Sequence, residues 1–185
     1  MSHRASVQVE FRNPETFESA CKAMGWEWQG KGSHRQYNGC HEGLGVKIPG
    51  WRYPIVLQDS ELIYDDASRY DTPFGVSYGH GRTADENGNV PEIIALRGEY
   101  AIQAAIAAAT AQGLYSERTG STLTIYLGAD ETITVTADGT VEANGFQGIG
   151  CSQPTMMIAA ALGSKMDVQA KSNFYQEQQM LTIQE

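Results

Sequence analysis

The chain has few cysteines and no long apolar run, and each shortage excludes a class of protein. Its 185 residues include only Cys21, Cys40 and Cys151. An odd, low number of cysteines is typical of a protein from a reducing compartment. The longest apolar stretch, Ala104–Ala111, contains Thr110 and is far too short to span a bilayer. Because the first eleven residues carry no apolar run, we expect no secretory signal, no membrane partner and a cytoplasmic location.

Positive charge is also scarce. The chain has 13 lysines and arginines against 22 acidic residues, which gives a formal net charge of −9 at pH 7. The part up to Gly120 carries 15 acidic and 11 basic side chains, and the rest carries 7 and 2. An acidic protein repels phosphate backbones, so the composition disfavours a nucleic-acid polymer as partner. A local group of arginines could still bind a small anion.

Three segments are predicted to be helices. Asn13 can cap free amides and Pro14 suits the first helical position, so these two residues predict the start of a helix over Pro14–Met24. An alanine-rich segment predicts a second helix over Arg97–Gln112. A third is predicted over Gln153–Leu162.

Alternation of apolar and polar residues predicts the strands. They are expected at Ala5–Phe11, Leu44–Ile48, Tyr53–Gln58, Glu61–Asp65, Val76–Tyr78, Leu123–Leu127, Ile133–Val135 and Thr140–Ala143. Asp138-Gly139 predicts a two-residue type I′ turn, which needs positive φ at both positions. The expected fold is therefore α+β, with one mainly antiparallel sheet and about three helices packed on one face.

Several of these segments also carry a family resemblance. The strand and hairpin "TITVTADGTVEANGF", then "GIGC", "AALG" and "NFYQE", resemble the uncharacterised domain family twenty-nine ninety-seven. The opening "MSH", then "AMGWEW", "YPIVLQD" and "YAIQAAIAAATAQGL", resemble the uncharacterised domain family twelve fifty-seven, which includes the hypothetical chloroplast reading frame thirty-five proteins.

The resemblance implies a fusion of two small proteins that are usually separate. Residues 1–119 would be the reading-frame-thirty-five-like α+β part, and residues 120–185 a small hairpin-and-helix part. Three strands and one helix are marginal alone, so we expect the second part to complete one compact unit with the first. Genes of these families often neighbour a MoxR-like AAA+ ATPase, which implies such a partner by association. The resemblance supplies no catalytic residues.

The glycine-rich turn before the third predicted helix is a first candidate site. Gly148 and Gly150 would let backbone amides approach an anion, and Cys151 at a helix start could have a lowered thiol pKa. The spacing lacks the lysine and hydroxyl of a phosphate-binding loop, and no cofactor fingerprint is present. We favour a structural turn with a buried thiol, and we expect no cofactor.

A second candidate is the segment Ser33–Gly43. It contains His34, Cys40, His41 and Glu42, and His80 could join them as a further metal ligand. Adjacent Cys40 and His41 diverge on a strand, and zinc sites usually have paired ligands two to four residues apart. The pattern therefore favours ordinary loop residues over a metal site.

A third candidate is a surface on which aromatic and arginine side chains interleave. The aromatic candidates are Trp51 and Tyr53, and the cationic ones are Arg52, Arg69 and Arg82. Aromatic faces and arginine forks can hold nucleobases and phosphates, and they are also common at protein interfaces. A sheet with aromatic cross-strand pairs and solvated arginines explains the same residues.

These patterns favour a protein without enzyme activity, although the sequence leaves that question open. We expect an accessory or adaptor protein that acts through protein–protein contacts, with a MoxR-like AAA+ ATPase or as a homo-oligomer. The alternative is a protein that binds a small, nucleotide-like anion on the aromatic and arginine-rich surface.

Overall fold

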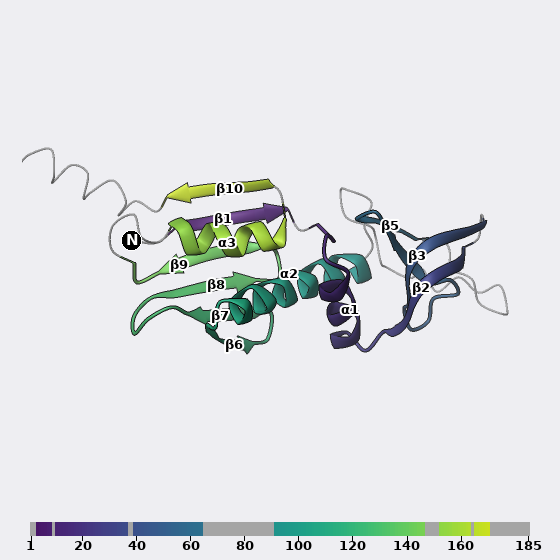
Figure 1. Cartoon of the computed structure of the whole chain (residues 1–185), viewed down its shortest axis with the longest axis horizontal. Coiled ribbons are helices and arrows are strands. Elements are labelled where there is room, and N and C mark those ends of the chain that lie inside the picture. The colour runs from purple at the N-terminus through teal and green to yellow at the C-terminus, as the bar shows by residue number, and fades with distance from the viewer. Residues whose placement is uncertain are drawn as a thin grey trace, which may run out of the picture. The chain divides into compact units, whose positions relative to one another are not determined.

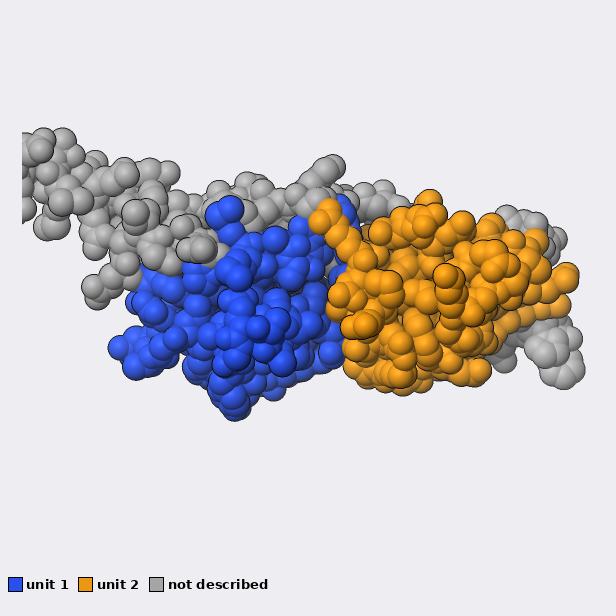
Figure 2. Space-filling model, in the orientation of Figure 1, with its two compact units in different colours: residues 1–10, 100–185 blue, residues 11–99 orange. Residues whose placement is uncertain are grey.

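The chain folds into an α+β structure with two antiparallel sheets (Figure 1). It is a computed structural model that describes residues 3–8, 10–36, 39–64, 91–146, 152–163 and 165–170. Residues 1–10 and 100–185 form unit 1, and residues 11–99 form unit 2 (Figure 2). The α+β class and the antiparallel pairing are confirmed, but the strands form two sheets rather than one. Among the described residues, no helix combines the length and apolar character of a transmembrane span.

Unit 1 is built on a six-stranded sheet in the order β10-β1-β9-β8-β7-β6. The strands are β1 (His3–Gln8), β6 (Tyr115–Thr119), β7 (Thr122–Tyr126), β8 (Thr132–Thr136), β9 (Thr140–Asn144) and β10 (Lys165–Ala170). Helix α3 (Ser152–Leu162) packs on β1 and β9. Alternate residues of the central strands are buried, and the buried ones include Leu123, Ile125, Ile133 and Val135. The predicted alternation in this part of the chain is confirmed.

Unit 2 contains a four-stranded sheet in the order β2-β3-β4-β5. The strands are β2 (Glu27–Gln36), β3 (Gly39–Lys47), β4 (Ile55–Gln58) and β5 (Glu61–Ile63). Helix α1 (Pro14–Ala23) packs on β2. Phe17 of this helix is fully buried and makes edge-to-face contacts with Phe11 at 5.5 Å and Trp28 at 6.0 Å between ring centroids.

Helix α2 (Pro91–Ala111) begins six residues before the predicted start at Arg97. Its first turns contribute Ile93 and Leu96 to the buried residues of unit 2. Its remaining turns contribute Tyr100, Ile102 and four alanines to the core of unit 1; the alanines are Ala101, Ala104, Ala105 and Ala109. Pro91 at the first position suits a helix start, because a proline there loses no hydrogen bond.

The turns differ from the expectation. Register pairs Val135 with Val141, so the loop before β9 is longer than the predicted two residues, and of Asp138 and Gly139 only Gly139 has positive φ (83°). The Asp138 side chain accepts a hydrogen bond from the Thr140 amide, which holds the longer turn. The two-residue turn with positive φ at both positions lies instead at Asp59 and Ser60, with φ of 48° and 69°.

Other elements were not predicted at all. These are β2, β6 and β10. In β2 and β6 a clear alternation of apolar side chains is missing, whereas Met166, Val168 and Ala170 of β10 do alternate with polar residues. The predicted strand Val76–Tyr78 lies outside the described residues. The compact units do not follow the division at residue 119 either, because Thr119 pairs with Thr122 in the β6–β7 hairpin inside unit 1.

The start of α1 gives a direct test of local stability. The Asn13 side chain accepts hydrogen bonds from the amides of Glu15 at 2.9 Å and Thr16 at 3.2 Å. Replacing Asn13 by alanine removes both acceptors, so Asn13→Ala is expected to lower the free energy of unfolding by about 1 kcal/mol in urea titrations.

The matched control is Ser19→Ala in the same helix. The Ser19 hydroxyl donates to the Glu15 carbonyl at an exposed position, and this change is expected to stay within about 0.5 kcal/mol. Equal unfolding free energies for Asn13→Ala and the unmodified chain would show that the cap does not stabilise α1.

Candidate functional site

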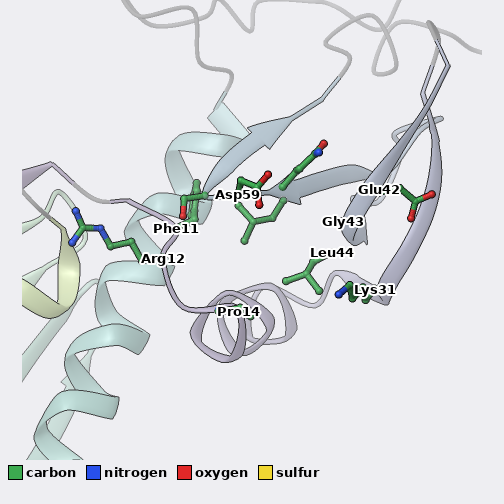
Figure 3. Close-up of a pocket in the computed structure, with 11 residues that line it drawn as sticks. Phe11, Arg12, Pro14, Lys31, Glu42, Gly43, Leu44 and Asp59 are labelled. Atoms are coloured by element: carbon green, nitrogen blue, oxygen red, sulfur yellow. The ribbon is translucent and has the colours of Figure 1, made fainter.

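A groove of about 610 Å³ opens on unit 2 between the start of α1 and the four-stranded sheet (Figure 3). Leu44 of β3 and Leu57 of β4 are direct cross-strand partners and form its apolar floor. Phe11 and Pro14 line the side formed by the start of α1. Its volume is in the range of small-molecule sites, roughly 300–1,000 Å³.

The groove has charged residues at both ends. Figure 3 shows Lys31 and Glu42 at one end, and Asp59 and Arg12 at the other. Arg12 directs its guanidinium away from the groove in this view, whereas Lys31 lines the groove at the opposite end. Lys31 lies directly opposite Leu44 in the β2–β3 register. Sequence analysis missed this groove, because residues from α1 and three strands meet there only through tertiary packing.

The aromatic and arginine-rich candidates do not form one surface in the described part of the chain. Trp51 is 5% exposed and packs edge-to-face against Tyr64 at 6.2 Å, so it belongs to the core. Arg52 is exposed, and its guanidinium carbon lies 5.4 Å from the centre of the Tyr53 ring. A cation on an aromatic face at this distance is attracted to it. Arg69 and Arg82 lie outside the described residues.

The β2–β3 hairpin sorts the metal candidates onto two faces. His34 lies directly opposite His41, so both side chains leave the same face of the hairpin. Cys40 lies opposite Arg35 on the other face, and both are exposed. His80 lies outside the described residues. Within the described ranges, no group of three or more His, Cys, Asp or Glu side chains could hold a metal ion.

His34 is buried, and its ring is positioned by a hydrogen bond and by close contact with a glycine. Its Nε2 is 3.0 Å from the carbonyl oxygen of Gly30, and a carbonyl can only accept, so Nε2 carries the proton. The ring lies against Gly45, where a Cβ atom would come within 2.2–2.5 Å of three ring atoms. Glycine at position 45 is therefore required for this placement of the imidazole.

The described cysteines differ in exposure. Cys21 of α1 is fully buried, and burial first and the Glu18 carboxylate second raise the pKa of its thiol to about 12. Cys40 is exposed on β3. Gly148 and Cys151, the candidates in the glycine-rich turn, lie outside the described residues, so their role stays a prediction.

No protein-family model matches this chain, and neither a curated protein nor a solved structure matches it. The resemblance to the two uncharacterised families therefore stays a hypothesis, and the geometry of the described residues is the basis for any functional proposal.

Alkylation of the native protein tests the assignment of the thiols. Cys40 is expected to react with iodoacetamide at pH 8, whereas Cys21 is expected to react only after denaturation, because the attacking species is the thiolate. Mass spectrometry of tryptic peptides after short labelling times gives the extent of reaction at each cysteine. Cys40→Ser is the control that identifies its peptide. Equal labelling rates for Cys21 and Cys40 in the folded protein would contradict the buried position of Cys21.

Proposed function

We propose that the protein is a non-enzymatic accessory protein that acts through protein–protein contacts made at the β6 edge of the six-stranded sheet. The observation behind this proposal is a pair of exposed aromatic residues. Tyr115 of β6 is 67% exposed and Tyr126 of β7 is 37% exposed. They are direct cross-strand partners, and their ring centroids are 5.5 Å apart.

Two physical arguments connect this pair to a protein partner. Tyrosine is enriched in the centre of protein interfaces, because it buries a large apolar area while its hydroxyl keeps a polar contact. In addition, β6 is the last strand at its edge among the described strands, and an edge strand offers backbone groups to which an extended segment can pair. Glu117 and Arg118 on the same strand add charges of both signs. Such charges limit indiscriminate edge-to-edge pairing and favour a complementary partner.

The partner classes follow from the family resemblance and from the geometry of a sheet edge. One is a MoxR-like AAA+ ATPase, and the other is a second copy of this chain. In both cases we place the protein in the cytoplasm, on the basis of its few cysteines. A second copy would pair through the same strand in both subunits, because the commonest homodimers are two-fold symmetric.

The tyrosine pair can be tested by substitution. The double variant Tyr115→Ser, Tyr126→Ser keeps a hydroxyl at both positions and removes the aromatic rings. Loss of two interface anchors that contribute more than about 1 kcal/mol each is expected to weaken association by at least about tenfold. Sedimentation velocity measures self-association, and a pull-down with a MoxR-like AAA+ ATPase from the same host measures the heterologous contact.

Met156→Ser is the matched control, because Met156 of α3 is 56% exposed and apolar but lies on a helix of the same unit. It is expected to leave association unchanged. The proposal would be wrong if the unmodified chain stayed monomeric and bound no ATPase, or if the tyrosine variant associated as well as the control.

We propose small-anion binding as a second candidate function, favoured by the groove on unit 2. Its volume of about 610 Å³ and its Lys31 side chain suit a small anionic molecule with an apolar part. Arg52, stacked on Tyr53, is the alternative anion contact on the same unit.

Calorimetric titration with ATP tests whether the anion is bound at Lys31 or at Arg52. Lys31→Glu reverses the charge in the groove and is expected to weaken binding at least about tenfold, since one charge-assisted hydrogen bond contributes about 1.5–3 kcal/mol. Lys22→Glu, which makes the same change of charge at an exposed position of α1, is expected to have no effect. If Arg52→Ala abolished binding while Lys31→Glu left it intact, the ligand would be held at Arg52. Absence of ATP binding to the unmodified chain would eliminate this candidate for nucleotide-like anions.

A further inference from the structure

The groove on unit 2 has side chains of opposite charge at its two ends (Figure 3). Lys31 lines one end and Asp59 lines the other; both are exposed, and neither forms an ion pair with another described residue. Glu42 lies at the Lys31 end, and Arg12 points away from the groove. A ligand with only negative charge would therefore meet two carboxylates and one ammonium. A ligand with an anion at one end and a cation at the other matches the lining better.

The strand register sets the distance between the two opposite charges. Lys31, Leu44 and Leu57 are direct neighbours across β2, β3 and β4, and Asp59 follows Leu57 by two residues. Neighbouring strands are about 4.8 Å apart and a strand rises about 3.3 Å per residue, so the Cα atoms of Lys31 and Asp59 are roughly 12 Å apart. A single amino acid is too short for this distance. Three extended residues span at most about 10–11 Å, and the two side chains reach across the remainder.

The lining between the charged ends suits a peptide. Leu44 and Leu57 form the apolar floor, which an apolar side chain of the ligand would cover. Gln58 and Ser60 line the groove next to Asp59 with an amide and a hydroxyl. Both groups can donate and accept hydrogen bonds, so they can pair with the N–H and C=O groups of a peptide bond.

We propose that the groove binds a short apolar peptide of about three residues, with its free carboxylate at Lys31 and its free amino group at Asp59. This inference rests on the small-anion function proposed for the groove, and it adds the cation that the two carboxylates of the lining require. Because each terminus meets the opposite charge in one direction only, the charges also fix the orientation of the peptide. The central side chain of the peptide lies on Leu44 and Leu57.

Calorimetric titration of the full chain with the tripeptide Ala-Leu-Ala tests the proposal. The unmodified chain is expected to bind one peptide. The N-acetyl form lacks the ammonium group, and the C-terminal amide lacks the carboxylate. Each capped form is expected to bind at least about tenfold more weakly than the free peptide, because each loses one charge-assisted hydrogen bond.

Two variants assign the termini of the peptide. Asp59→Asn is expected to weaken binding of the free peptide at least about tenfold and to bind the free and N-acetyl forms equally. Asparagine tolerates the φ of 48° at this position, so the turn is kept. Lys31→Gln is expected to bind the free peptide and its amide equally. The matched controls are Glu61→Gln and Lys22→Gln, which remove a charge at exposed positions outside the groove and are expected to bind as the unmodified chain does.

The peptide proposal is overturned if the unmodified chain does not bind Ala-Leu-Ala, or if either capped form binds as tightly as the free peptide. It is also overturned if Asp59→Asn still prefers the free peptide to the N-acetyl form. Binding of ATP that depends on Lys31, without binding of the peptide, would leave the small-anion function standing and overturn the peptide proposal alone. Binding of the peptide without binding of ATP would support the peptide and eliminate nucleotide-like anions.

Discussion

Antiparallel pairing of neighbouring strands decides which side chains meet across the two described sheets. The register places His34 against His41, Leu44 against Leu57 and Tyr115 against Tyr126. Because side chains alternate between the two faces of a strand, a slip of one residue would move each of these groups to the opposite face. In β2 an irregularity between Trp28 and Gly30 shifts the register once, and the pairing of His34 with His41 lies beyond that shift.

Glycine makes the close packing of the smaller sheet possible. A Cβ atom at Gly45 would collide with the imidazole of His34, and one at Gly43 would come within 2.5 Å of the Leu57 carbonyl oxygen. Real Cβ atoms essentially never show such distances, so these positions admit only glycine in the present arrangement. Glycines also weaken the apolar alternation of β2 and β3, because a glycine has no side chain to mark the buried face.

The weakened alternation in β2 and β3 is one reason why only part of the fold could be predicted from the sequence. Helix α1 was predictable because Asn13 and Pro14 act locally, and β7 and β8 were predictable because each has a solvated face. Strand β2 was not, since its buried face is made of glycine, His34 and Gln36. For the candidate sites, the sequence shows which residue types are present, but it does not show which face of the sheet each side chain leaves. Trp51 is predicted to lie on a binding surface, but the structure buries it. Burial of its large aromatic side chain stabilises the core.

The order in which the units occur along the chain has a consequence for synthesis. Unit 2 is one continuous segment, residues 11–99, whereas unit 1 is interrupted by it. Strand β1 pairs with β9 and β10, and its Arg4 lies opposite Glu142 and Gln169. During translation, every residue of unit 2 is therefore made before the partners of β1 exist. The sheet of unit 1 closes around β1 only after β9 and β10 have been made, and such pairing of distant segments is intrinsically slow.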